Sequence, residues 1–122
     1  MTGLRIDPRY RWVDTGIDVS AGQTLVFRAS GKLKDWYIPT DADGFAFNPA
    51  GLFARRRYPQ HNWLALLGAL DRDPDGVFPI GLREEKLFNQ SGRLFVFVND
   101  HDSDFAYGNN KGVLSLTVTV GG

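Results

Sequence analysis

The segment from Val113 to Val120 reads VLSLTVTV, and it alternates strictly between apolar and polar residues. A period of two places successive side chains on opposite faces of a β-strand. We therefore expect Leu114, Leu116, Val118 and Val120 to face a core. The serine and threonines between them suit the half-solvated face of a sheet.

Other segments also carry strand patterns. Arg93 to Asn99 (RLFVFVN) is apolar on both alternating faces, as expected of a strand that is covered on two sides. Asn62 to Leu70 (NWLALLGAL) has a composition that favours helix, but its length and its terminal breakers favour a buried strand. The further strand candidates are Ile17 to Val19, Gln23 to Ala29, Phe78 to Leu82 and Glu85 to Phe88.

These six to eight short strands, with 14 glycines and no convincing amphipathic helix, predict an all-β fold. We expect one small two-sheet β-sandwich that spans residues 1–122, since this length suits a single core. Between Gly31 and His61 the chain shows only fragments of strand pattern. Long ordered loops of this kind usually carry function.

Composition excludes several classes of protein. The 14 basic and 14 acidic residues cancel, so no overall charge recruits nucleic acid. The chain contains no cysteine, which rules out disulfides and thiolate metal sites. No stretch approaches the ~20 apolar residues of a membrane span, and no signal peptide is recognisable. We expect a soluble protein that is cytoplasmic, or exported without a recognisable signal peptide.

The segment from Asn99 to Asn110 (NDHDSDFAYGNN) is rich in the oxygen donors that calcium prefers. Asp100, Asp102 and Asp104 match the first ligand positions of an EF-hand, but the sixth position is Phe105 and the twelfth is Lys111. The segment is therefore no EF-hand. It is either a calcium loop of another kind or a polar hairpin loop with Asx turns.

Two other charged clusters allow more than one interpretation. Asp71 to Gly76 (DRDPDG) begins like a calcium loop, but Pro74 and the Asp75-Gly76 pair favour a turn; a second ion stays open. The run Arg55-Arg56-Arg57 could meet phosphate, sulfate or an acidic sugar. A solvated loop face is the interpretation that we favour for it.

The loop resembles the calcium loop of the PA-IL type bacterial galactose-binding lectins. The motif that carries the resemblance is Asn99-Asp100, then Tyr107-Gly108-Asn109-Asn110 and Gly112, with two more spacer residues than the family has. The resemblance extends weakly through Ala21-Gly22-Gln23 and Gly31, through Gly68-Ala69-Leu70, and into the last strand. It implies a galactose-binding-like jelly roll, in which protein oxygens and two adjacent sugar hydroxyls share one calcium ion.

The resemblance also implies roles for particular residues. Asp100, Asn109 and Asn110 would bind calcium through side-chain oxygens, and Ala106 through its backbone carbonyl. Another carbonyl would come from Asp35, counted from Gly31, or from Tyr37, counted back from Pro39. The residues expected to contact the sugar are Asp100, His101, Asn109, Trp36, Tyr37 and Asn48; aromatic rings such as those of Trp36 and Tyr37 stack on sugar faces, unless they pack on the core.

We therefore expect a calcium-dependent, non-enzymatic, lectin-like carbohydrate-binding domain, with a galactose-type sugar as its ligand. A homo-oligomer, dimer or tetramer, would suit weak sugar sites, and the resembling lectins are tetramers. The alternative is a non-catalytic structural or protein-interaction sandwich, in which calcium is purely structural or absent. A third hypothesis is a small glycan-processing enzyme that uses the acidic loops.

Overall fold

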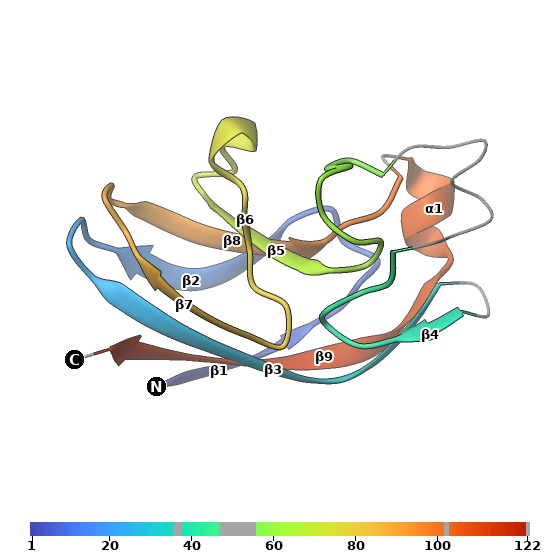
Figure 1. The fold of residues 1–122 in the computed structure, drawn as a ribbon, viewed down its shortest axis with the longest axis horizontal. Helices are drawn as coiled ribbons and strands as arrows, with labels where there is room; N and C mark the ends of the chain where they lie inside the picture. Colours follow the sequence, from blue (N-terminus) through green and yellow to red (C-terminus); the bar gives the residue numbers. More distant parts are fainter. Residues whose placement is uncertain (36–37, 47–55, 102, 122) are drawn as a thin grey trace.

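The computed structural model describes residues 1–35, 38–46, 56–101 and 103–121, and here nine strands form two packed antiparallel sheets (Figure 1). One sheet has the order β1 (Thr2–Ile6), β9 (Asn110–Gly121), β3 (Thr24–Asp35), β4 (Ile38–Thr40), and β7 (Arg83–Leu87) pairs with the other half of β3. The second sheet has the order β2 (Val13–Val19), β8 (Gly92–Val98), β5 (Leu66–Leu70), β6 (Phe78–Pro79). The expected all-β sandwich is confirmed.

The alternating strand β9 buries its apolar face between the sheets. Leu114, Leu116 and Val118 are at most 3% exposed and belong to the main core. Val120 continues the same alternation but is 62% exposed, so its predicted place in the core is wrong. It lies near the C-terminal end of β9, at the outer end of the sandwich (Figure 1).

Strand β8 is covered on both faces, as its sequence predicts. Leu94, Val96 and Val98 point into the main core. Phe97 lies on the other face in a second cluster, where Trp12 stacks against it edge-on at 4.7 Å between ring centroids. This second cluster gives the outer face of the sheet an aromatic cover.

Three strand predictions need correction. The strand that begins in QTLVFRA does not end at Gly31 but continues to Asp35, inside the predicted long loop. The first strand, β1, was not predicted, because TGLRI shows little alternation. Of the strand predicted over Asn62 to Leu70, only Leu66–Leu70 forms, since Leu64 takes a left-handed backbone conformation (φ 57°) that leaves the sheet.

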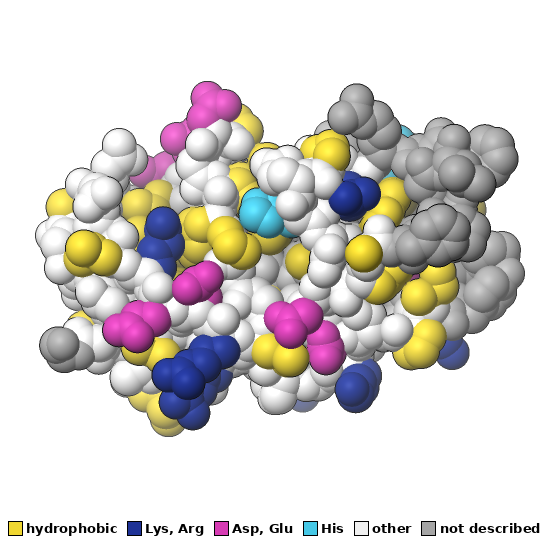
Figure 2. Space-filling model, in the orientation of Figure 1, with side chains coloured by type: hydrophobic (Ala, Val, Ile, Leu, Met, Phe, Trp, Pro, Cys, Tyr) yellow, Lys and Arg dark blue, Asp and Glu magenta, His cyan; other side chains and the backbone are white. Residues whose placement is uncertain are grey.

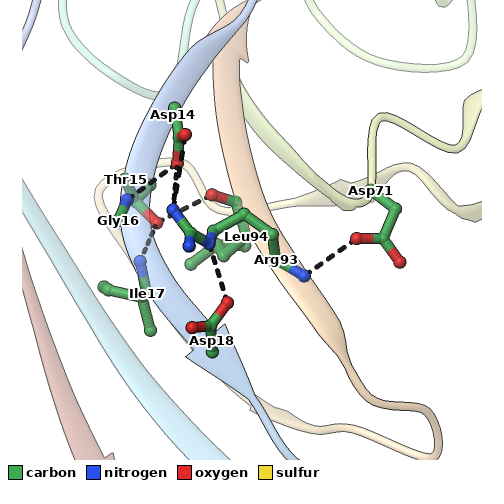
Figure 3. A network of polar contacts seen from close by, with 8 residues as sticks. All are labelled: Asp14, Thr15, Gly16, Ile17, Asp18, Asp71, Arg93 and Leu94. Atoms are coloured by element: carbon green, nitrogen blue, oxygen red, sulfur yellow. Dashed lines mark hydrogen bonds and ion pairs between the residues drawn. The ribbon is translucent and has the colours of Figure 1, made fainter.

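Arg93 holds the outer edge of the second sheet together, as Figure 3 shows. Its guanidinium donates to Asp18 at 2.7 Å and to Asp14 at 3.3 Å, across an irregularity in β2. Its backbone N–H donates to the Asp71 carboxylate at 2.9 Å. Asp73 accepts from the Asp75 N–H and caps a short 3₁₀ turn, η2 (Pro74–Gly76). The cluster from Asp71 to Gly76 is thus a turn whose first two carboxylates bind backbone amides.

The surface carries both signs of charge. On the face drawn in Figure 2, acidic and basic side chains are interspersed, in keeping with a formal net charge of zero. The described part of the chain has no helix with the length and apolarity of a membrane span.

Candidate functional site

The predicted calcium loop lies at one end of the sandwich. It leaves β8 after Val98, forms the short helix α1 (Asp104–Gly108), and enters β9 at Asn110. Figure 1 shows α1 at the end of the molecule opposite to the two chain termini, close to where β3 ends and β4 begins. Segments far apart in the sequence therefore converge around the loop.

Backbone pairing brings Asp35 beside the loop. β3 and β9 pair along their whole length, and the register sets Asp35 opposite Asn110. Two glycines with positive φ permit this close pairing: a Cβ on Gly31 would lie 2.5 Å from the Val113 carbonyl oxygen, and one on Gly112 would lie 2.2 Å from that of Lys32. Neither position accepts a side chain without displacing backbone.

Two side-chain oxygens at this meeting point are buried and have no hydrogen-bond partner among the described residues: Oδ2 of Asp100 and Oδ1 of Asn110. Asp100 is 2% exposed and Asn110 is 1% exposed. The Asn110 amide nitrogen donates to the Pro8 carbonyl at 3.0 Å, while Asp100 Oδ1 accepts from the His101 N–H at 2.7 Å. Buried polar atoms without a hydrogen-bond partner are rare in proteins, and many of them bind an ion or a water molecule.

Asp100 is a buried carboxyl group close to a second one, that of Asp35. Burial, with a smaller contribution from the charge of Asp35, raises the pKa of Asp100 from 3.8 to about 6. The His101 N–H and the nearby Asn110 side chain offset part of the rise. A bound cation would remove the cost of burying this charge, because opposite charge favours the ionised form.

Asn99 fixes the strand end from which Asp100 projects. Its side chain is fully buried, and its amide nitrogen donates to the carbonyls of Tyr58, His61 and Asn62 at 2.9, 3.2 and 3.0 Å. Its amide oxygen accepts from the Tyr58 N–H at 3.0 Å. One side chain thus holds the 58–62 segment against the end of β8.

Arg57 fixes the same strand end from the other side. Its backbone N–H donates to the Asp100 carbonyl at 2.8 Å, and its guanidinium donates to the Tyr107 hydroxyl at 2.8 Å. That hydroxyl donates in turn to the Val98 carbonyl at 2.9 Å, and burial raises the pKa of Tyr107 to about 12. Tyr107, which belongs to the lectin-like motif, therefore ties α1 to β8.

Helix α1 was not predicted and shapes the middle of the loop. Ser103 caps it by accepting from the Ala106 N–H at 3.1 Å. Asn109 is the C-cap, and its N–H approaches the Ala106 carbonyl at 3.3 Å. A carbonyl oxygen has two lone pairs, so that of Ala106 could bind a cation beside this hydrogen bond.

The predicted residues fall into three groups. Asp100, Asn110 and Asp35 come together at the ends of β8, β9 and β3. Ala106, Asn109 and the half-buried His101 lie in the same loop, and their roles stay predictions. Trp36, Tyr37 and Asn48 lie outside the described residues, as does Asp102.

The donor set suits calcium better than a transition metal. Within residues 1–35, 38–46, 56–101 and 103–121, no three His, Cys, Asp or Glu side chains gather as a metal cluster. The two unpartnered atoms are a carboxylate oxygen and an amide oxygen, and calcium accepts both, together with backbone carbonyls. The residues present therefore fit a calcium ion.

Two residues that organise the site were not predicted from the sequence. Pro8, which holds the Asn110 amide, lies about a hundred positions away, and no local pattern links the two. Arg57 belongs to a run of three arginines in which nothing distinguishes one from the next. Asn99 gave a stronger signal, because it belongs to the motif shared with the lectins.

Comparison with known proteins supports the fold. No protein-family model and no curated sequence matches the chain. Among solved structures, one described as "EclA N-terminal domain; PllA-like lectin" is similar, with a TM-score of 0.74 and 18% identity. The match covers 99% of this chain and 97% of the lectin chain. The fold implied by the lectin resemblance is thus confirmed: along almost its whole length, the chain has the β-sandwich of a PllA-like lectin.

Proposed function

We propose that the chain is a calcium-dependent carbohydrate-binding domain. One observation carries the proposal: two buried, unpartnered oxygens, Asp100 Oδ2 and Asn110 Oδ1, occupy the loop in which the lectin resemblance expects the ligands. Similarity to a lectin fold supports the carbohydrate half of the proposal. A galactose-type sugar is the first candidate ligand.

The proposed roles of the residues are those that the lectin resemblance implies. Asp100 and Asn110 would hold the ion through side-chain oxygens, and Asn109, with the Ala106 and Asp35 carbonyls, would complete the protein ligands. When bound, calcium supplies open coordination positions that two adjacent hydroxyls can fill in place of water. Asn99, Arg57 and Tyr107 hold the backbone of the loop, so that little ordering remains to be done when the ligands bind. No bond is cleaved.

Calorimetry tests the proposal. Galactose is titrated into the chain in 1 mM calcium and again in excess chelator, and calcium is titrated alone. We expect calcium to bind, and galactose to bind only in its presence. Calcium binding without any saccharide binding would instead support a structural ion, and the absence of both would contradict the proposal.

The acidic turn between β5 and β6 provides a matched control. Asp73→Asn removes a carboxylate from the cluster that also resembles a calcium loop, and asparagine can still cap η2. We expect this variant to bind one calcium ion with unchanged affinity. A fall in calcium stoichiometry would show that the turn holds an ion of its own.

Calcium affinity should depend on pH through Asp100. Since its pKa is raised to about 6, protons compete with calcium below that pH, and the affinity should fall by about tenfold for each pH unit once Asp100 is mostly protonated. Calcium titrations at pH 7.5, 6 and 5 measure this dependence. An affinity that stays constant over this range would contradict the assignment of Asp100 as a ligand.

Without calcium, the folding stability that Asp100 contributes should change with pH in the opposite direction to the calcium affinity. A carboxyl whose pKa rises from 3.8 to about 6 on folding binds its proton more tightly in the folded state, so its contribution is lost as pH rises through 6. The stability of the wild type relative to Asp100→Asn should therefore decrease between pH 4 and 7. Thermal unfolding of the two proteins in chelator measures this difference.

A further inference from the structure

A hollow adjoins the loop on the outer face of the β2-β8-β5 sheet. It has a volume of about 640 Å³, and four parts of the chain line it. They are Trp12, the 56–58 segment, the turn residues Arg72 and Pro74, and His101 of the loop. No aspartate or glutamate is among these lining residues. Three guanidinium groups thus share one hollow in a chain whose net charge is zero.

Each of these guanidinium groups lies over an aromatic ring. The Arg57 guanidinium carbon lies 4.2 Å from the Phe97 ring centroid and 5.1 Å from that of Trp12. Arg72 lies 4.7 Å from the Phe95 ring centroid, and Arg56 lies 5.5 Å from that of Trp63. Stacking occupies the planar face of a guanidinium and leaves its in-plane N–H groups free to donate.

Several of these N–H groups donate to no residue in the part of the chain that the structure describes. The side-chain bonds of Arg57, to the Arg11 carbonyl and the Tyr107 hydroxyl, both come from Nη1. Arg56 donates to the carbonyls of His61 and Pro59 through Nε and Nη2. Among the described residues, no carboxylate forms an ion pair with Arg56, Arg57 or Arg72, although Asp14 lies near enough to Arg72 for that charge to lower the pKa of Asp14.

The hollow and the calcium loop share a wall. His101 lines the hollow and directly follows Asp100, and Arg56 forms a backbone bridge with His101. Since successive Cα atoms are about 3.8 Å apart, the wall of the hollow begins one residue from the buried carboxylate. In the proposal below, a substituent of a loop-bound saccharide reaches the arginines across this wall.

We infer that this hollow is an anion subsite, and that the chain prefers saccharides that carry a carboxylate or a sulfate ester. The inference rests on the proposed function for the saccharide, but the anion subsite stands on the three arginines alone. Guanidinium groups match both anions, because carboxylate and sulfate each accept two parallel N–H bonds. The acidic group would add to the weak contacts of a calcium-bound diol.

Arg72 is the residue that tests the subsite. It lies on an exposed turn, whereas Arg56 and Arg57 also hold the loop backbone. Arg72→Gln removes the charge and keeps most of the length of the side chain. Arg28→Gln is the matched control, because Arg28 is exposed on β3 in the opposite sheet.

The experiment compares galactose, galacturonic acid and galactose 6-sulfate by calorimetry in calcium. We expect both acidic sugars to bind about tenfold more tightly than galactose, which matches one charge-assisted contact of about 1.4 kcal/mol. Arg72→Gln should lose most of this preference and Arg28→Gln should keep it. Preference for only one acidic sugar would identify the anion. No preference, or a preference that survives Arg72→Gln, would overturn the inference.

A titration with inorganic sulfate tests the anion subsite independently of the proposed saccharide binding. In chelator, sulfate should shift the backbone amide resonances of Arg72 and His101 in the wild type, and not in Arg72→Gln. This result without any sugar binding would overturn the proposed function and the saccharide preference, and would support the anion subsite. Unchanged resonances would overturn the subsite, whatever the sugars do.

Discussion

Replacing Asp100 by asparagine is expected to abolish calcium binding and, with it, saccharide binding. Asp100 offers the one described carboxylate oxygen that is buried and unpartnered in the loop. An amide of the same shape donates where the carboxylate accepts, and it carries no charge to neutralise the ion. The loss should exceed the roughly 10- to 100-fold that changes to outer-shell partners cost in metal affinity. Calcium titration by calorimetry measures it.

The same variant should remain folded. Asp100→Asn removes a buried charge, so its unfolding free energy in chelator should equal or exceed that of the wild type at pH 7. Calcium should raise the unfolding temperature of the wild type and leave that of the variant unchanged, because only a ligand that binds the folded state stabilises it. Calcium affinity of the variant within threefold of the wild type would contradict the assigned role of Asp100.

The largest loss of stability at a polar residue is expected for Asn99→Ala. The change removes the acceptor of the Tyr58 N–H and one of two donors to each of the Tyr58, His61 and Asn62 carbonyls. A group left without a partner costs about 1–3 kcal/mol and each further hydrogen bond lost costs about 1 kcal/mol, so we expect a total loss of about 2–4 kcal/mol. Urea unfolding in chelator measures this loss without any contribution from the ion.

Asn89→Ala is the matched control for that measurement. Asn89 is exposed in the turn before β8, where a substitution should change stability by less than about 0.5 kcal/mol. Asn99→Ala should also weaken calcium binding, because the backbone that carries Asp100 loses its clamp. A loss of less than about 1 kcal/mol would show that the 58–62 segment is held by other contacts.

The periodicity of apolar residues predicted the strands whose pattern directly reflects which of their faces are buried. Val113 to Val118 alternates because one face of β9 is buried, and RLFVFVN is apolar throughout because both faces of β8 are covered. Periodicity failed where backbone geometry overrides it. Gly31 was expected to end a strand, but its positive φ, matched by that of Gly112 across the pair, lets β3 run on to Asp35.

The structure adds observations on three of the predicted site residues, whose roles stay predictions. Asp100 and Asn110 were named from the motif alone, and the structure leaves one oxygen of each buried and unpartnered. Asp35 was one of two residues allowed by counting, and its pairing with Asn110 places it at the site. The supports Pro8 and Arg57 could not be predicted, because contacts across 102 and 43 positions leave no local pattern.

The arginine run illustrates the same limit. Arg55-Arg56-Arg57 was interpreted as a solvated loop face, yet Arg57 stacks on buried aromatic rings and holds the backbone of the loop. Stacking of arginine on aromatic rings has no sequence period, since the partner Trp12 precedes β2 and Phe97 belongs to β8. Only the three-dimensional arrangement distinguishes the anchored arginine from its neighbours.

A crystal structure of the chain grown with calcium and galactose tests the central claim most directly. The account predicts anomalous density in the Asn99 to Asn110 loop, with Asp100 Oδ2 and Asn110 Oδ1 among six to eight oxygens at ~2.3–2.6 Å and two of those oxygens from the sugar. A loop without an ion under these conditions, or an ion bound elsewhere with these two oxygens still unpartnered, would contradict it.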